Sequence, residues 1–211
     1  MSLPREVVEE VQGAARRGTG PEAVAALAAA VEALDRGRLA EAERAGARAK
    51  AAAPRSSAVR EVLGMALYRS ERYREALREL QAYRRMTGRA DQNHLIADSY
   101  RALGSPEKAP ALAQEALAAR IPAEVRAEAV VVAAAALADL GRFEEALTLL
   151  RRFPTQPETA RPHDLRVWYV AGDILERAGR RREAAREFRR VVDHDPDAFD
   201  AAERLASLSD R

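Results

Sequence analysis

Few side chains in this sequence have a type and spacing that could support chemistry. The three histidines, His94, His163 and His194, are isolated, and none has a second histidine at the helical spacing that a metal site on a helix requires. The segment 193–197 (DHDPD) could suggest a cation site. An acid-rich turn that ends a helical unit is the simpler interpretation, so no metal site is predicted.

Motifs for nucleotide binding and nucleophilic catalysis are not found either. The stretch GTGPE, residues 18–22, lacks the lysine and the spacing of a phosphate-binding loop. Ser56 and Ser57 stand where a helix is expected to start, and no local motif supports either as a nucleophile. The chain has no cysteine, which excludes disulfides, thiolate metal sites and cysteine nucleophiles. We therefore expect a protein that is not an enzyme and uses no cofactor.

The elements that position the side chains are predicted to be helices. Hydrophobic residues make up 47% of the chain but aromatic residues only 5%, so much of the apolar content is alanine, the best helix former. The first residues carry charges where a signal peptide would be apolar, and the longest apolar run, residues 129–138, is about half of a membrane span. A cytoplasmic protein without membrane association is expected.

The positive charge of the chain is carried almost entirely by arginine. The net charge is only +2, and acids are interspersed with the bases. Glu183 and Glu187 alternate with the densest basic cluster at helical spacing, which favours a solvated outer face over a nucleic-acid surface. That cluster consists of Arg180, Arg181, Arg182, Arg186, Arg189 and Arg190.

A small residue recurs along the chain every 33 to 38 positions. These anchors are Ala30, Gly64, Ala97, Ala134 and Gly172. Seven positions after each anchor a turn is expected, at Gly37, Glu71, Gly104, Gly141 and Gly179. Twelve positions after each anchor stands an alanine: Ala42, Ala76, Ala109, Ala146 and Ala184. A period of this length is typical of stacked helical hairpins.

The pattern has a simple physical meaning. The anchor belongs to the first helix of a hairpin and the alanine to the second, and only small side chains fit where two helices cross closely. We therefore expect Gly172 to face Ala184 across such a crossing.

The last copy carries the most complete set of repeat positions. They are Trp168, Ala171, Gly172, Leu175, Ala184, Phe188, Val191 and Pro196. This set resembles the tetratricopeptide repeat family, and the resemblance extends over roughly residues 23–198. It implies an all-α, right-handed α-solenoid of five helical hairpins at 23–198. An N-terminal packing helix with its linker would occupy 1–22, and a capping helix 199–211.

The ends of the array and two departures from the period give further expectations. An apolar stripe predicts an N-terminal helix from about Pro4 to Arg16. Pro110 lies too far into the second helix of copy three, so that helix should start late or kink. The proline-rich segment 153–164 is predicted to be a mobile loop. The capping helix should bury one face, formed by Phe199, Ala202, Leu205 and Ala206.

The resemblance also implies a function, the binding of a protein or peptide segment in a concave groove lined by the first helices. Candidate lining residues are Glu61, Met65, Tyr68, Arg69, His94, Asp98, Arg101, Tyr169 and Asp173. The whole lining would contain eight acids: Asp35, Glu61, Asp91, Asp98, Glu128, Asp139, Asp173 and Glu176. It would contain four bases: Arg69, Arg101, Arg166 and Arg177. An acidic groove favours a basic peptide as partner.

One subtype of the family clamps a C-terminal carboxylate with lysine, asparagine and arginine on successive first helices. The matching positions here are Leu27, Val31, Glu61, Met65 and Leu95, which cannot do so, and no carboxylate clamp is expected. Two alternatives to the peptide-binding scaffold stay open. One is a nucleic-acid-associated accessory protein that uses the outer arginines, and the other is a structural subunit whose groove is filled by a second copy of the chain.

Overall fold

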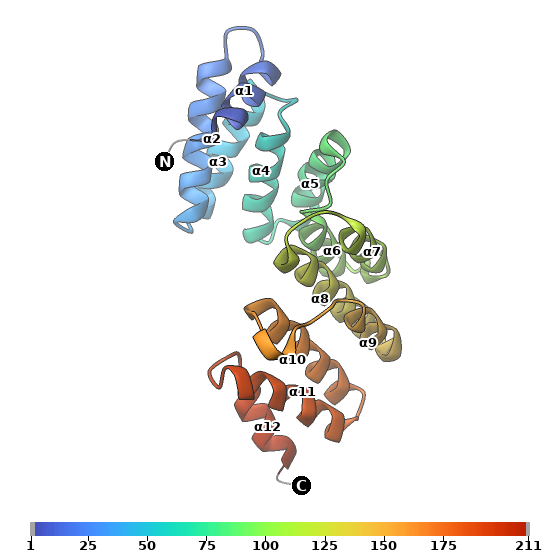
Figure 1. Ribbon diagram of the computed structural model, residues 1–211. Helices are drawn as coiled ribbons and strands as arrows, with labels where there is room; N and C mark the ends of the chain where they lie inside the picture. Colours follow the sequence, from blue (N-terminus) through green and yellow to red (C-terminus); the bar gives the residue numbers. More distant parts are fainter. Residues whose placement is uncertain (1–2, 210–211) are drawn as a thin grey trace. The chain divides into compact units, whose positions relative to one another are not determined.

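The computed structural model describes residues 3–209, and all regular elements of this part are helices. The chain divides between Leu103 and Gly104 into two compact units (Figure 1). Within each unit, consecutive helices are joined by short turns and pack as pairs. The all-α class and the repeated helical pairs that the periodicity predicts are confirmed.

The N-terminal unit contains two complete pairs and two further helices. α2 pairs with α3 and α4 with α5, while α1 packs on α2 and α4, and α6 packs on α5 and α4. The helices are α1 (Arg5–Ala14), α2 (Gly20–Asp35), α3 (Leu39–Ala52), α4 (Ser57–Arg69), α5 (Tyr73–Thr87) and α6 (Asn93–Ala102).

The C-terminal unit is built in the same way. α8 pairs with α9 and α10 with α11; α7 packs on α8, and α12 packs on α11. Its helices are α7 (Ala109–Ala118), α8 (Ala123–Asp139), α9 (Phe143–Arg151), α10 (Pro162–Arg177), α11 (Arg181–His194) and α12 (Ala201–Ser209). Two short 3-10 turns, η1 (Pro106–Lys108) and η2 (Pro157–Thr159), precede α7 and α10.

The anchor residues and their partner alanines form the centre of the helical pairs. All five alanines of the second helices are fully buried, as are the anchors Ala30, Ala97 and Ala134. Both glycine anchors are buried as well. The spacing therefore identifies the close crossings correctly. In copy five, however, a Cβ atom on Gly172 would meet the ring of Phe188 at 2.7 Å, so the residue that faces this anchor is Phe188 rather than Ala184.

The five expected turn positions all adopt the left-handed backbone conformation. Four are glycines with φ between 70° and 76°, and the fifth, Glu71, has a φ of 60°. In copy five, the N–H of Gly179 donates to the Glu176 carbonyl at 2.9 Å and the N–H of Arg180 to the Leu175 carbonyl at 2.8 Å. This pair of bonds closes the helix end in the Schellman manner, which requires a left-handed residue.

The proline-rich segments behave as their chemistry requires. In copy three the second helix starts late, since η1 precedes α7 and Pro110 then falls within the first turn of α7. The first helix of this copy, α6, belongs to the N-terminal unit, and α7 belongs to the C-terminal unit. Segment 153–164 contains only η2 before α10 begins at Pro162, a residue type favoured in the first turn of a helix.

The terminal helices differ in how well their buried faces are predicted. α1 places Val11 in a core cluster with α2 and α4, as expected. The predicted face of α12 is wrong: Phe199 is 48% exposed, and Ala202 and Ala206 are also exposed. Phe199 takes a φ of 59°, so the helix begins only at Ala201. The buried face is shifted accordingly and includes Ala201 and Leu208.

Candidate functional site

The structure distributes the candidate groove residues over the two units. Glu61, Met65, Tyr68 and Arg69 lie on α4, and His94, Asp98 and Arg101 lie on α6, all in the N-terminal unit. Tyr169 and Asp173 lie on α10 in the C-terminal unit. The first seven thus come from adjacent first helices, since α4 packs on both α2 and α6. We call the side of α4 and α6 that carries these residues, together with Asp35 at the end of α2, the N-terminal first-helix face.

Asp98 is the point where polar side chains of α4 and α6 meet. The Tyr68 hydroxyl donates to Asp98 Oδ2 at 2.7 Å, and Arg101 Nη1 lies 3.4 Å from Asp98 Oδ1. The Tyr68 ring packs edge-on against Tyr73, with 5.8 Å between the ring centroids. Tyr68 therefore has a structural role in joining the two helices, and its ring is half-buried.

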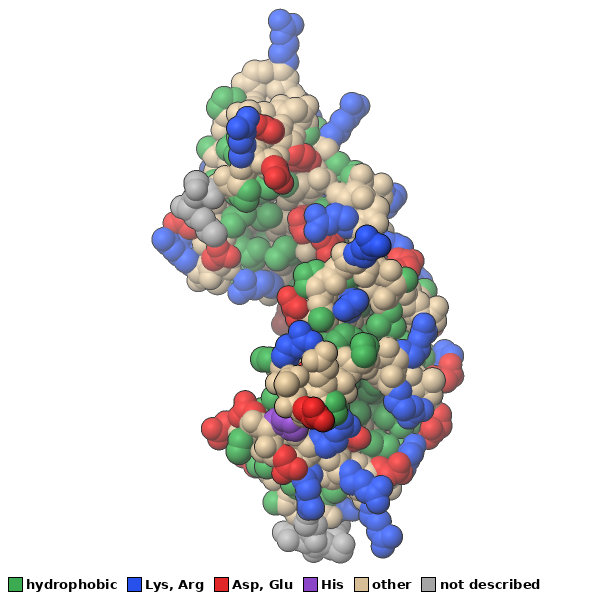
Figure 2. All heavy atoms as spheres, viewed as in Figure 1, with side chains coloured by type: hydrophobic (Ala, Val, Ile, Leu, Met, Phe, Trp, Pro, Cys, Tyr) green, Lys and Arg blue, Asp and Glu red, His purple; other side chains and the backbone are tan. Residues whose placement is uncertain are grey.

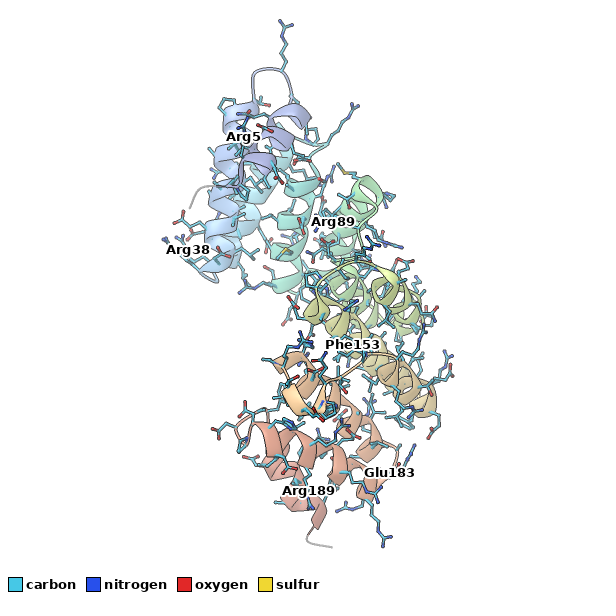
Figure 3. The ribbon with its side chains drawn as sticks, in the orientation of Figure 1. Arg5, Arg38, Arg89, Phe153, Glu183 and Arg189 are labelled. Atoms are coloured by element: carbon cyan, nitrogen blue, oxygen red, sulfur yellow. The ribbon has the colours of Figure 1, made fainter. Side chains whose placement is uncertain are left out.

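Glu61 holds a second polar connection between α4 and α6. The Gln92 side-chain amide donates to Glu61 Oε1 at 2.8 Å. Burial raises the pKa of Glu61, and the nearby carboxylate of Asp91 acts in the same direction. Asp91 itself accepts from the Tyr83 hydroxyl at 3.0 Å and pairs with Arg89, which Figure 3 labels. Glu61 is thus an acid in a partly buried setting that contains a second negative charge.

The remaining candidates of this face combine apolar packing with modest polarity. Arg69 Nη1 donates to the Leu34 backbone carbonyl at 2.8 Å, in the last turn of α2 where helix carbonyls lack intrahelical partners. Met65 packs on a core cluster that includes Leu34. Burial lowers the pKa of His94, so the neutral imidazole is favoured. His94 is suited to packing or neutral hydrogen bonding rather than to acting as a cation.

In the C-terminal unit, Tyr169 and Asp173 contact the capping helix. The Tyr169 hydroxyl donates to Asp200 Oδ1 at 2.6 Å, and its ring lies 4.6 Å from that of Phe199. Arg204 Nη1 lies 2.9 Å from Asp173 Oδ1, and Arg204 Nη2 lies 2.7 Å from Glu176 Oε2. Arg204 is not among the residues that the sequence pattern predicts at this site. A lone arginine in a helical sequence pattern does not indicate contacts of this kind.

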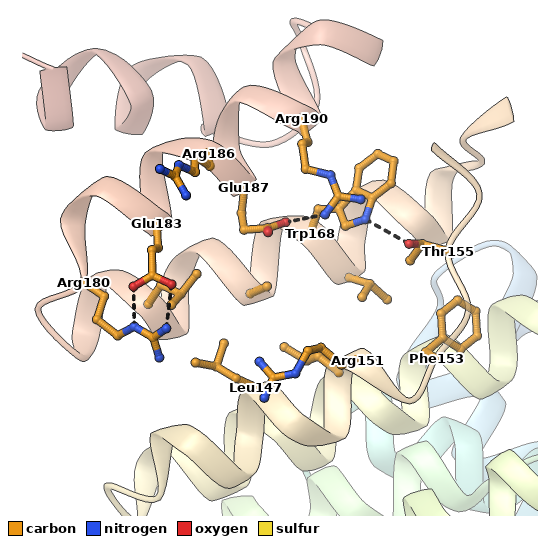
Figure 4. Close-up of a pocket in the computed structure, with 14 residues that line it drawn as sticks. Leu147, Arg151, Phe153, Thr155, Trp168, Arg180, Glu183, Arg186, Glu187 and Arg190 are labelled. Atoms are coloured by element: carbon orange, nitrogen blue, oxygen red, sulfur yellow. Dashed lines mark hydrogen bonds and ion pairs between the residues drawn. The ribbon is translucent and has the colours of Figure 1, made fainter. Parts of the chain in front are cut away.

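A cavity of about 350 Å³ lies elsewhere in the C-terminal unit, where α9 and α11 flank α10 (Figure 4). Trp168 on α10 forms one wall, and its indole N–H donates to Thr155 Oγ1 at 3.3 Å. The Phe153 ring is buried and stacks edge-on against His163. Charged side chains from both flanking helices line the remaining wall: Arg151, Arg180, Glu183, Arg186, Glu187 and Arg190.

The described residues offer little for metal or membrane chemistry. Within residues 3–209, no group of three or more histidine, aspartate or glutamate side chains is placed to hold a metal ion. In the same range, no helix combines the length and apolarity that crossing a membrane requires. Charged side chains of both signs are mixed over the visible face of each unit (Figure 2).

The comparison with protein families agrees with this architecture. A family model described as tetratrico peptide repeat matches residues 94–198. The chain belongs to the tetratricopeptide repeat family. The family is a helical-repeat scaffold that is generally non-catalytic and that typically mediates protein or peptide binding.

The fold of this tetratricopeptide repeat protein is shared by a solved structure. The crystal structure of YrrB, described as a TPR protein with an unusual peptide-binding site, superposes with a TM-score of 0.59 at 20% identity. The match covers 82% of this chain and 87% of that one. The structure of Naa15/Naa10 bound to HypK-THB gives a TM-score of 0.38 at 20% identity, over 86% of this chain and 33% of that one. No curated protein matches the chain by sequence.

Proposed function

We propose that this tetratricopeptide repeat protein is a non-catalytic scaffold that binds a basic segment of a partner protein on its N-terminal first-helix face. The observation that carries the proposal is a difference in ion pairing between the first helices of the two units. It concerns the acids at the predicted lining positions, four of which lie in each unit.

In the C-terminal unit, all four lining acids are in ion pairs. Arg166 Nε lies 2.6 Å from Glu128 Oε1, and Arg177 Nη2 lies 3.0 Å from Asp139 Oδ1. The other two, Asp173 and Glu176, share Arg204. A basic ligand at these acids would have to displace an existing partner. The attraction that this surface offers to a cation is therefore small.

In the N-terminal unit, the lining acids are less neutralised. Glu61 and Asp35 form no ion pair with an arginine or lysine among the described residues. Asp91 is buried and pairs with Arg89, and Asp98 has one ion-pair partner, Arg101, at the longer distance of 3.4 Å. The guanidinium of Arg69 donates to a backbone carbonyl instead of a carboxylate. With Asp91 paired to Arg89, the three remaining lining acids outnumber the two arginines of the face, Arg69 and Arg101, by one. The face thus keeps a negative field that can steer a lysine- or arginine-bearing segment.

Apolar and aromatic side chains on the same face supply the contact area that an extended ligand needs. Met65, Tyr68 and His94 are all half-buried, so each presents part of its surface to solvent. Repeat arrays offer such surfaces to peptide segments, and YrrB, which shares the fold, is described as having a peptide-binding site. These features support protein or peptide binding.

The test is a stopped-flow and equilibrium titration with two peptides of equal length, one carrying lysines and the other glutamates at the same positions. The basic peptide should bind faster and more tightly, and its association rate should fall as salt rises. Tighter binding of the acidic peptide to this face would overturn the proposal. Sedimentation velocity over a range of protein concentrations checks the alternative in which a second copy of the chain covers the face.

A further inference from the structure

The cavity between α9, α10 and α11 carries charge of the opposite sign to the N-terminal first-helix face. Four arginines and two glutamates line it. The two glutamates are already held: Glu183 Oε2 lies 2.6 Å from Arg180 Nη2, and Glu187 Oε2 lies 2.9 Å from Arg190 Nη1 (Figure 4). The cavity is therefore positive after its internal ion pairs are counted.

Arg151 and Arg186 account for that positive charge. Arg151 extends from α9 and Arg186 from α11, on opposite sides of the cavity (Figure 4). Arg151 Nη2 contacts only a neutral group, Thr148 Oγ1, at 2.9 Å. Arg186 acts electrostatically on Glu183, whose carboxylate is already bound by Arg180. Among the described residues, neither Arg151 nor Arg186 has a carboxylate as an ion-pair partner.

The floor and back wall of the cavity are apolar. Leu147, Leu150, Val167 and Leu175 lie there with Trp168. The Arg190 guanidinium covers the indole of Trp168 at 4.2 Å from the ring centroid, which holds the aromatic wall in place. A volume of about 350 Å³ is within the range of sites that bind small groups, and it can accept one large side chain.

We propose that this cavity binds an acidic segment of a partner protein, with an apolar side chain placed against Leu147 and Leu150, beside Trp168, and an adjacent carboxylate held between Arg151 and Arg186. Arginine is suited to this role because its planar group donates two parallel hydrogen bonds to one carboxylate. The site lies between α9, α10 and α11 in the C-terminal unit and does not depend on the proposed basic-segment site of α4 and α6.

A nucleic acid fits the same features less well. Binding of single strands uses open aromatic faces on which bases stack, and Arg190 already covers the face of Trp168. Two exposed arginines of α11 that do not line this cavity, Arg182 and Arg189, would serve a phosphate backbone equally well. They provide a matched control, because their removal changes the net charge by the same amount as removal of Arg151 and Arg186.

The experiment uses the full chain and the fluorescence of Trp168, the only tryptophan in the sequence. The probe is a capped peptide with one leucine flanked by glutamates, and the reference peptide has glutamines in their place. The glutamate peptide should change the Trp168 emission at saturation. The Arg151→Gln/Arg186→Gln protein should bind the glutamate peptide about tenfold or more weakly. The reason is that one hydrogen bond to a charged group contributes more free energy than a tenfold change in Kd represents.

The control protein, Arg182→Gln/Arg189→Gln, should keep its affinity for the glutamate peptide within about twofold of wild type, as expected of screened surface charges. Equal losses in the two double variants, or equal binding of the glutamine peptide, would overturn the proposal. So would a single-stranded oligonucleotide that binds more tightly than the peptide and displaces it. Circular dichroism of each variant confirms that the helical fold is retained.

Discussion

The ring of Phe188 occupies the space in which a side chain on Gly172 would lie. A Cβ atom built on Gly172 would stand 2.7 Å from Phe188 Cε1 and 2.9 Å from Cζ. The same relationship recurs in copy two, where a Cβ on Gly64 would meet Leu80 Cδ2 at 2.6 Å. In both pairs the larger residue follows the glycine by sixteen positions. A glycine in the first helix thus allows a large side chain of the second helix to pack into the crossing.

Replacing Gly172 with leucine should therefore destabilise the C-terminal unit. Overpacking of a filled crossing typically costs about 1–3 kcal/mol, and the smaller Gly172→Ala should cost less than the leucine variant. Chemical denaturation measures both. Gly13 on α1 is the control, because no atom lies within 4 Å of its added Cβ, and Gly13→Ala should be neutral or stabilising. An unchanged unfolding free energy for Gly172→Leu would show that this crossing is assigned incorrectly.

Glu71 is the one turn position of the five that pairs a side chain with left-handed backbone. An L-residue in this conformation is strained by roughly 1–2 kcal/mol. A glycine would relieve this strain, but its greater freedom in the unfolded chain offsets part of the gain in stability. Glu71→Gly should stabilise the protein by about 0.5–1 kcal/mol. The reverse change at the equivalent turn, Gly141→Glu, should destabilise it. Two shifts of the same sign in thermal unfolding would contradict this explanation.

The loop before α10 should loosen as pH rises, because His194 ties it to α11. His194 Nδ1 lies 2.7 Å from the Arg190 carbonyl oxygen and Nε2 lies 2.7 Å from that of Pro157. Only the imidazolium donates from both nitrogens, so these hydrogen bonds raise the pKa of His194 above 6.5. Their contribution is fully present below the unfolded value near 6.5 and is lost as pH rises through the higher folded value.

Tryptic cleavage at the exposed Arg161 reports this change. We expect it to be the earliest internal cut, since prolines interrupt hydrogen bonding in segment 153–164. Dividing the cleavage rate by that of an unstructured peptide with the same sequence removes the pH dependence of trypsin itself. This ratio should rise with pH over the range in which NMR shows His194 losing its proton. In His194→Gln the ratio should be high and independent of pH. Early cleavage inside residues 129–140 would count against this assignment.

Glu61→Gln should stabilise the free protein while weakening its binding to basic peptides. Burial raises the pKa of Glu61, so ionisation of this carboxyl opposes folding at neutral pH. Glutamine keeps an acceptor for Gln92 without the charge. The melting temperature should exceed that of wild type at pH 7, and the difference should shrink as pH falls through the Glu61 pKa. A variant that is less stable at pH 7 would show that the charge itself is needed for packing.

The repeat itself could be predicted from the sequence because small residues at close crossings and glycines at helix ends have direct steric causes. The five alanines and five turns follow from these rules alone. The partner of Gly172 could not be chosen between Ala184 and Phe188, since both lie on the same side of the second helix. Which of the two residues comes closest to Gly172 depends on how far the two helices are displaced along each other.

The charged contacts could not be predicted because they join helices that are far apart in sequence. Glu79 on α5 is 5% exposed, with Lys50 Nζ and Arg60 Nη1 each 2.6 Å from its carboxylate oxygens, and the three residues come from three helices. Arg204 on α12 pairs with Asp173 on α10, across a sequence separation that includes the whole of α11. The sequence predicts the excess of acids at the lining positions of the first helices. It does not predict that the four lining acids of the C-terminal unit form ion pairs with Arg166, Arg177 and Arg204.

The most direct test of the account compares Asp98→Asn and Asp173→Asn in one titration with a basic peptide. The two changes remove the same charge from equivalent first-helix positions, but Asp173 pairs with Arg204 at 2.9 Å, whereas the ion pair of Asp98 with Arg101 is longer, at 3.4 Å, and its other contact is the neutral hydroxyl of Tyr68. Asp98→Asn should weaken binding and reduce its salt dependence, while Asp173→Asn leaves both unchanged. If the Asp173 variant loses affinity and the Asp98 variant keeps it, the basic segment does not bind on the N-terminal first-helix face.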